Sequence, residues 1–167
     1  MVRFVPKSGK ILTSRSSLSG TDRIYEFPKY SLVVVSIFEG EVPLQLFVSA
    51  IAKRVVAATD AQGKLLRPEF KQFVRRRFGF LFWHEEANFN IEDHVRIYDG
   101  KYKCQLQGQE VTPEILMLVA NELAYKPFKK DSSPWEVLIL HNYRESPDAP
   151  LSTASIIHIH HSLGKTI

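Results

Sequence analysis

Residues 154–160 constrain the fold of this chain more than any other segment. Three of these seven residues are isoleucines, and a short β-branched apolar run of this kind is typical of a strand. Two adjacent histidines, His160 and His161, stand at the end of the run. An unperturbed imidazole titrates close to neutral pH, so one member of such a pair can accept a proton. The segment therefore predicts a strand whose end holds a candidate general base.

Four further segments have strand patterns. The most apolar of them, residues 32–38, is rich in valine and is expected to be buried on both faces. Large aromatic residues alternate along residues 70–83, which is typical of a strand, and we expect one strand there. The remaining two strands are expected at residues 94–98 and 135–140.

Two helices are expected between these strands. Apolar residues repeat at helical spacing within residues 43–58, so one face of that helix is expected to be buried. A second helix begins where Thr112 supplies a hydroxyl cap, Pro113 suits the first position and Glu114 favours the positive end of the helix dipole. Helices and strands alternate, with several strands adjacent. This order predicts an α/β fold in which helices flank a mixed sheet.

The chain has 167 residues, enough for one domain. Residues 1–20 are rich in serine, glycine and basic residues and are expected to form a flexible leader, with the domain at residues 21–167. Residues 1–30 hold six basic and two acidic residues, which accounts for the whole net charge of +4. We expect no nucleic-acid partner, because the rest of the chain is neutral. The leader is either a solvated tail or a contact with an anionic membrane surface.

The single cysteine, Cys104, allows no internal disulfide, so an intracellular location is expected. The longest apolar run, residues 32–38, is much shorter than the roughly 20 residues of a membrane-spanning helix. The first residues contain no continuous apolar stretch, so we expect no secretory signal.

The histidine cluster allows three interpretations when the residues alone are considered. On a strand, His158 and His160 share one face and His161 points to the other. Two imidazoles on one face can begin a metal site, but no Cys, Asp or Glu stands close by to complete it, so we expect no metal. The other two interpretations are structural histidines and a general base.

Four blocks of the sequence occur in the order found in a known family. Residues 160–164, His-His-Ser-Leu-Gly, are similar to the first five positions of an HHxxxDG motif. Residues 83–95 are similar to a Trp-acid-Phe-x-hydrophobic-x-x-His-Val block, and residues 126–136 to a PLWE segment without its Leu. Residues 19–22 resemble an opening Asp segment. Over residues 19–164 the chain thus resembles the wax ester synthase/diacylglycerol acyltransferase family of acyl-CoA-dependent O-acyltransferases, relatives of the nonribosomal peptide condensation domains.

The resemblance implies one half of a two-part fold. Members of this family consist of two chloramphenicol-acetyltransferase-like halves with an active-site tunnel between them. The chain corresponds to the N-terminal half, and it departs from the motif where Lys165 replaces Asp and Thr166 replaces Gly. We therefore expect an acyltransferase domain that is truncated within the motif and lacks its C-terminal half as a partner.

The resemblance also implies a reaction. The family transfers a fatty acyl group from acyl-CoA to a long-chain alcohol or diacylglycerol, which gives wax ester or triacylglycerol. Acyl-CoA is the co-substrate and no separate cofactor is expected. His161 is implied as the general base and His160 as the residue that orients the loop. Members are associated with the endoplasmic reticulum or lipid bodies, so a peripheral membrane or lipid-droplet contact is expected.

An alternative is a catalytically inactive fragment that acts as a binding or regulatory partner. Because the chain lacks the Asp of the motif and the second half of the tunnel, we expect it to form no ester by itself. Outside the histidine pair, His94, Trp83 and Trp135 are expected to be structural. Glu136 either pairs with a neighbouring helix or faces solvent.

Overall fold

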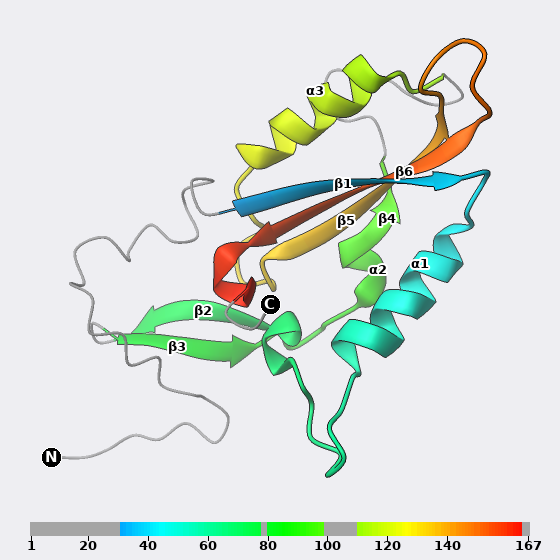
Figure 1. Cartoon of the computed structure of the whole chain (residues 1–167). Helices are drawn as coiled ribbons and strands as arrows, with labels where there is room; N and C mark the ends of the chain where they lie inside the picture. The colour runs from blue at the N-terminus through cyan, green and yellow to red at the C-terminus, as the bar shows by residue number, and fades with distance from the viewer. Residues whose placement is uncertain (1–30, 78–79, 99–109, 165–167) are drawn as a thin grey trace, which may run out of the picture.

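The computed structural model describes residues 31–77, 80–98 and 110–164, and its centre is a four-stranded mixed sheet (Figure 1). The spatial order is β1-β6-β5-β4, in which β6 pairs antiparallel with both of its neighbours and β4 pairs parallel with β5. This arrangement confirms the predicted fold class. The strands are β1 (Ser31–Glu39), β4 (Val95–Ile97), β5 (Trp135–Tyr143) and β6 (Ser152–His160).

Helix α3 (Pro113–Ala124) covers one face of the sheet, as Figure 1 shows. The Thr112 hydroxyl accepts a hydrogen bond from the backbone N–H of Ile115, so the predicted cap is confirmed. The helix buries one apolar stripe against Leu138 of β5 and Ile156 of β6; the stripe consists of Leu116, Val119, Ala120 and Leu123.

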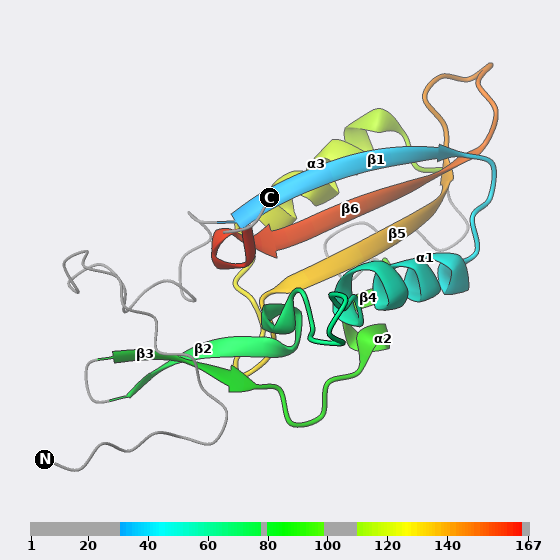
Figure 2. The ribbon, with the colours of Figure 1, turned by 60° about the horizontal axis from the view of Figure 1, so that its bottom comes forward.

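Helix α1 (Leu44–Ile51) lies on the opposite face, where it contacts β4 and where Phe47 meets Phe38 of β1 edge-on at 5.1 Å (Figure 2). The helix continues as a π-helical turn, Ala52–Val56, so the helix predicted for residues 43–58 is confirmed with a wider final turn. Val48 and Val56 pack here against Val95 and Val137 of the sheet. The sheet therefore lies between two apolar layers.

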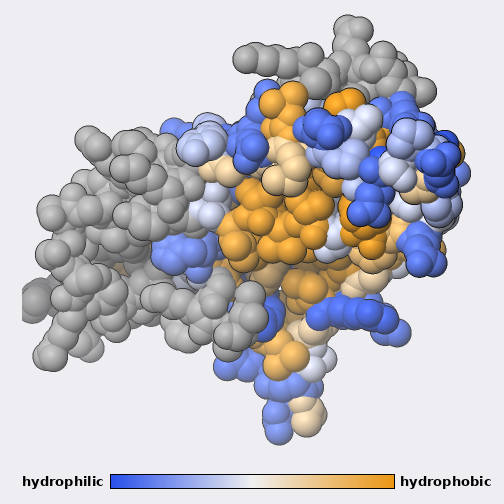
Figure 3. Space-filling model, turned by 45° about the horizontal axis from the view of Figure 1, so that its top comes forward, coloured by the Kyte–Doolittle hydropathy of each residue, from blue (hydrophilic) through white to orange (hydrophobic). Residues whose placement is uncertain are grey.

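The prediction that residues 32–38 are buried on both faces is wrong. The strand forms, as β1, but it lies at the edge of the sheet, with β6 as its neighbour. Leu32 is 51% exposed and Ile37 is 47% exposed, because β6 is the only neighbour of β1 among the described strands and α1 covers only part of its surface. Figure 3 shows a broad hydrophobic area on one face of the molecule.

The single strand predicted for residues 70–83 is also wrong, because the structure has two antiparallel strands there. These strands, β2 (Gln72–Arg77) and β3 (Phe80–Glu85), form a hairpin apart from the main sheet (Figure 1). Phe73 in β2 and the alternating Phe80 and Phe82 in β3 give the whole stretch an aromatic character, which conceals the break. Gly79 is the local signal that favours a turn.

The strand predicted at residues 94–98 begins one residue later than expected. A single helical turn, α2 (Ile91–His94), comes first, and the Asn90 side chain caps it by accepting from the N–H of Glu92. Strand β5 extends to Tyr143, past the predicted end at residue 140, and β6 confirms the strand predicted at the end of the chain. Residues 1–20, Cys104, Lys165 and Thr166 lie outside the described residues.

Among the helices that the structure describes, none is long and apolar enough to cross a membrane.

Candidate functional site

The two adjacent histidines at the end of β6 have opposite environments. His160 is the last strand residue and is 1% exposed, whereas His161 begins a 3-10 turn, His161–Gly164, and is exposed. The strand ends at His160, and the backbone turns at His161. Their ring centroids remain only 4.8 Å apart. His161 is therefore accessible to solvent, although the residue next to it in the chain is buried.

His160 holds the turn to the end of the strand. The backbone N–H of Ser162 donates to Nδ1 of His160 at 3.2 Å, and the Ser162 hydroxyl lies 2.8 Å from the same nitrogen. An Nδ1 that accepts from a backbone N–H carries no proton itself, so this contact selects one form of the His160 ring. Leu163, 1% exposed, packs into the core below the turn. These contacts orient the turn that carries His161.

Phe128 connects the buried histidines of β6. Its ring stacks on His158 with centroids 4.2 Å apart and an interplanar angle of 17°. It meets His160 edge-on at 6.1 Å and 86°. His158 and His160 are both buried and both contact this ring, in agreement with the prediction that they share one face of the strand.

Glu136 forms a buried ionic cluster beside His158. It lies opposite His158 in the register of β5 and β6, and its Oε1 accepts from Nδ1 of His158 at 3.2 Å. Lys126 Nζ donates to both carboxylate oxygens, at 2.9 and 3.0 Å, and Arg96 donates to Oε2 at 2.9 Å. The side chain therefore pairs with residues on two strands and on the segment after α3, although Glu136 is only 9% exposed.

These contacts keep Glu136 ionised. Burial raises the pKa of its carboxyl, but the hydrogen bonds from His158 and Lys126 and the positive charges of Lys126 and Arg96 lower it by more. The net effect moves the pKa of Glu136 from 4.5 to about 2. Glu136 is therefore a carboxylate throughout the neutral and mildly acidic range.

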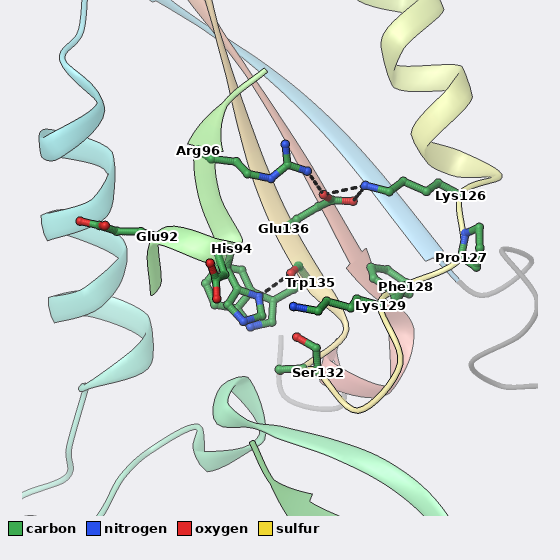
Figure 4. Close-up of a pocket in the computed structure, with 12 residues that line it drawn as sticks. Glu92, His94, Arg96, Lys126, Pro127, Phe128, Lys129, Ser132, Trp135 and Glu136 are labelled. Atoms are coloured by element: carbon green, nitrogen blue, oxygen red, sulfur yellow. Dashed lines mark hydrogen bonds and ion pairs between the residues drawn. The ribbon is translucent and has the colours of Figure 1, made fainter. Parts of the chain in front are cut away.

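A pocket of about 510 Å³ opens beside this cluster (Figure 4). Glu136, Arg96 and Lys126 form one wall, and Phe128 separates the pocket from the buried histidines of β6. His161 does not line the pocket. The candidate base therefore lies outside the charged pocket, although Phe128 both lines the pocket and contacts the neighbouring His160.

His94 lines the pocket but is 3% exposed, and its contacts are those of a packed side chain. Its ring stacks between Trp135, at 4.5 Å, and Phe89, at 5.1 Å, and its Nδ1 donates to the backbone carbonyl of Trp135 at 2.8 Å. Trp83 and Trp135 are 8% and 3% exposed, which confirms that both fill the core.

Sequence analysis identified the histidine pair but left the environment of Glu136 open. An acidic residue in phase with Leu138 and Leu140 along a strand is directed at the same buried face, and this phase is the signal that would have found it. Within the described parts of the chain, no group of three His, Cys, Asp or Glu side chains could hold a metal ion.

Acid is expected to destabilise the fold through Glu136. The folded pKa lies below the unfolded value, so the stabilisation is complete above about pH 4.5 and is lost as the pH falls toward 2. We expect a loss of about 3 kcal/mol from this group. Urea unfolding at several acidic pH values measures it, and Glu136→Gln should flatten the dependence. An equally steep dependence in that variant would refute the assignment.

Comparisons with known proteins identify the fold. No protein-family model matches the sequence, and no curated protein matches it. Among solved structures, the chain is similar to the wax ester synthase/diacylglycerol acyltransferase from Marinobacter aquaeolei VT8, with a TM-score of 0.51 and 17% identity. The match covers 86% of this chain and 34% of that chain. A condensation domain that mediates chain release from the enacyloxin polyketide synthase gives a TM-score of 0.49 at 16% identity, covering 91% of this chain and 28% of that one.

The likeness at this identity is one of fold, and the chain spans about a third of the length of the synthase. The chain therefore has a chloramphenicol-acetyltransferase-like fold, of which it spans one part.

Proposed function

We propose that this domain takes part in the transfer of a fatty acyl group from acyl-CoA to the hydroxyl of a long-chain alcohol or diacylglycerol, with His161 as the general base. The observation that carries the proposal is the exposed imidazole of His161 at the end of β6, beside a buried His160 that orients its turn. A base must reach the hydroxyl of its substrate, and His161 is the accessible member of the pair.

In the proposed reaction, His161 accepts the proton of the acceptor hydroxyl. The oxygen attacks the thioester carbonyl and a C–O bond forms, after which the C–S bond breaks and CoA leaves as a thiolate. The imidazolium then returns the proton to the sulfur, so His161 is regenerated and no further cofactor takes part. General-base assistance of this type contributes about 10²–10⁴-fold to the rate.

The position at a strand end suits this role. The pairing of β6 with both β1 and β5 fixes the backbone up to His160, and one further residue places the base at the surface. A base held on such an element keeps its distance to the reacting oxygen, and small displacements are costly in catalysis. A lipid acceptor also implies that the domain works at a membrane or lipid-droplet surface.

The test is ester formation from labelled acyl-CoA and a long-chain alcohol or diacylglycerol. The chain is assayed alone and after co-expression with the remaining part of the Marinobacter aquaeolei synthase, because the chain spans about a third of that structure. We expect ester in the complemented sample, and a loss of about 10²–10⁴-fold in His161→Ala.

Two controls make the assay decisive. His141→Ala removes an imidazole near the C-terminal end of β5, whereas the end of β6 that precedes His161 pairs with the start of β5. This variant should keep the activity. The Marinobacter synthase, divided at the corresponding position and reassembled, shows that complementation can work. If the divided synthase is active while this chain gives no ester in either sample, or if His161→Ala retains full activity, the proposal is wrong.

A further inference from the structure

Glu136 has contacts that the proposed reaction does not use. Its two oxygens accept from Lys126, Arg96 and His158 at 2.9–3.2 Å, and the side chain is 12% exposed. Burying a carboxylate costs free energy unless its oxygens accept well-aligned hydrogen bonds from partners such as these. This cluster lies one strand away from the turn that carries His161.

A continuous set of contacts joins the cluster to that turn. Glu136 fixes the His158 ring through Nδ1, and Phe128 stacks on that ring at 4.2 Å. The edge of Phe128 then meets His160, whose Nδ1 accepts from the backbone N–H of Ser162 in the turn. Each ring in this series contacts the one before it.

We propose that Glu136 is a positioning residue, which orients His158 and the Phe128 ring and thereby holds His160 and the turn that presents His161. The catalytic part of this statement rests on the proposed function, whereas the orientation of the rings does not. Figure 4 shows Glu136, Lys126 and Phe128 on one wall of the pocket, with Arg96 directed at the same carboxylate.

The carboxylate also selects the form of His158. A carboxylate only accepts, so Nδ1 of His158 carries the proton and Nε2 is left as an acceptor. That Nε2 atom is buried and has no hydrogen-bond partner among the residues that the structure describes. No competing donor therefore fixes the ring from its other side, and its orientation depends on Glu136 and on the Phe128 stack.

The test uses Glu136→Gln and the NMR signals of the histidine rings in the whole chain. A Gln side chain has one acceptor oxygen, which Lys126 and Arg96 both attract, so its NH₂ group turns toward Nδ1 of His158. We expect the proton of His158 to move from Nδ1 to Nε2, which ¹⁵N shifts report directly. We also expect the ring signals of His160 and His161 to shift.

Glu110→Gln is the matched control, because it removes a carboxylate from an exposed ion pair with Arg144 at 2.7 Å. It should leave the histidine signals unchanged. If Glu136→Gln does not fold, Phe128→Leu separates His158 from His160 without altering the ionic cluster, and it should shift the His160 and His161 signals. Unchanged His160 and His161 signals in a folded Glu136→Gln or Phe128→Leu protein would overturn the proposal.

The complemented ester assay adds a second readout. We expect Glu136→Gln to lower kcat about tenfold or more at an unchanged KM, because a displaced base acts after substrate is bound. An unchanged kcat in an active assembly would overturn the catalytic part. The absence of ester from the unmodified chain would refute the proposed function, whereas the NMR result stands independently of activity.

Discussion

Trp135→Ala is expected to lower the free energy of unfolding by about 3–5 kcal/mol. The indole is 3% exposed, stacks on His94 at 4.5 Å and meets Phe70 edge-on at 5.5 Å. Its Nε1 donates to the backbone carbonyl of Phe70 at 2.9 Å. The alanine variant loses the buried area, the ring contacts and this hydrogen bond together, and it leaves a cavity at the start of β5.

Urea unfolding followed by far-UV circular dichroism measures this effect. Trp135→Phe keeps a ring in the cavity and should lose less stability, while the loss of the indole N–H leaves the Phe70 carbonyl unpaired. Leu46→Ala is the surface control, because Leu46 is 60% exposed and should change stability by less than about 0.5 kcal/mol. A similar small change in Trp135→Ala would show that the packing at the start of β5 is not as described.

Glu136→Leu is expected to destabilise the protein by about 2–4 kcal/mol. The substitution leaves Lys126, Arg96 and the Nδ1–H of His158 without their shared acceptor. The side chains of Lys126 and Arg96 are 22% and 32% exposed and can turn partly toward water, which places the loss below that of a fully enclosed pair. Most of this loss in stability arises because the three donors lose their acceptor, and less of it arises from the missing attraction between Glu136 and the two cations.

A double-mutant cycle separates these contributions. Lys126→Met in the Glu136→Leu background removes one unmatched cation, so the two losses should fall short of additivity by about 0.5–3 kcal/mol. The unmodified chain, the two single variants and the double variant are all measured by urea unfolding near neutral pH, where Glu136 of the unmodified chain is ionised. Strictly additive losses would mean that Lys126 and Glu136 do not stabilise each other in the folded state.

Local patterns predicted most of the elements. Thr112 and Pro113 begin a helix through contacts with residues that are close in the sequence. Strand β6 forms because its β-branched residues favour an extended backbone. The difference between His160 and His161 arises because the strand ends at His160 and His161 begins the exposed turn. These features require no knowledge of distant parts of the chain.

The remaining features depend on contacts between distant residues. The exposure of β1 could not be predicted from its apolar sequence, because whether a strand lies at an edge depends on the order of the whole sheet. Glu136 meets Arg96 and His158, which are 40 and 22 residues away along the chain. Each of these residues alone has the pattern of an ordinary strand residue. Only the register of the sheet brings them together and makes the acidic residue a buried partner.

The end of β6 exposes His161 and buries His158 and His160. Diethyl pyrocarbonate modification of the folded chain, followed by peptide mass spectrometry over time, tests this arrangement at each histidine. We predict that His161 reacts quickly, whereas His158 and His160 react more than about tenfold more slowly, because they become accessible only when the structure opens. Protection of His161, or a His160 that reacts as fast as His161, would contradict the account.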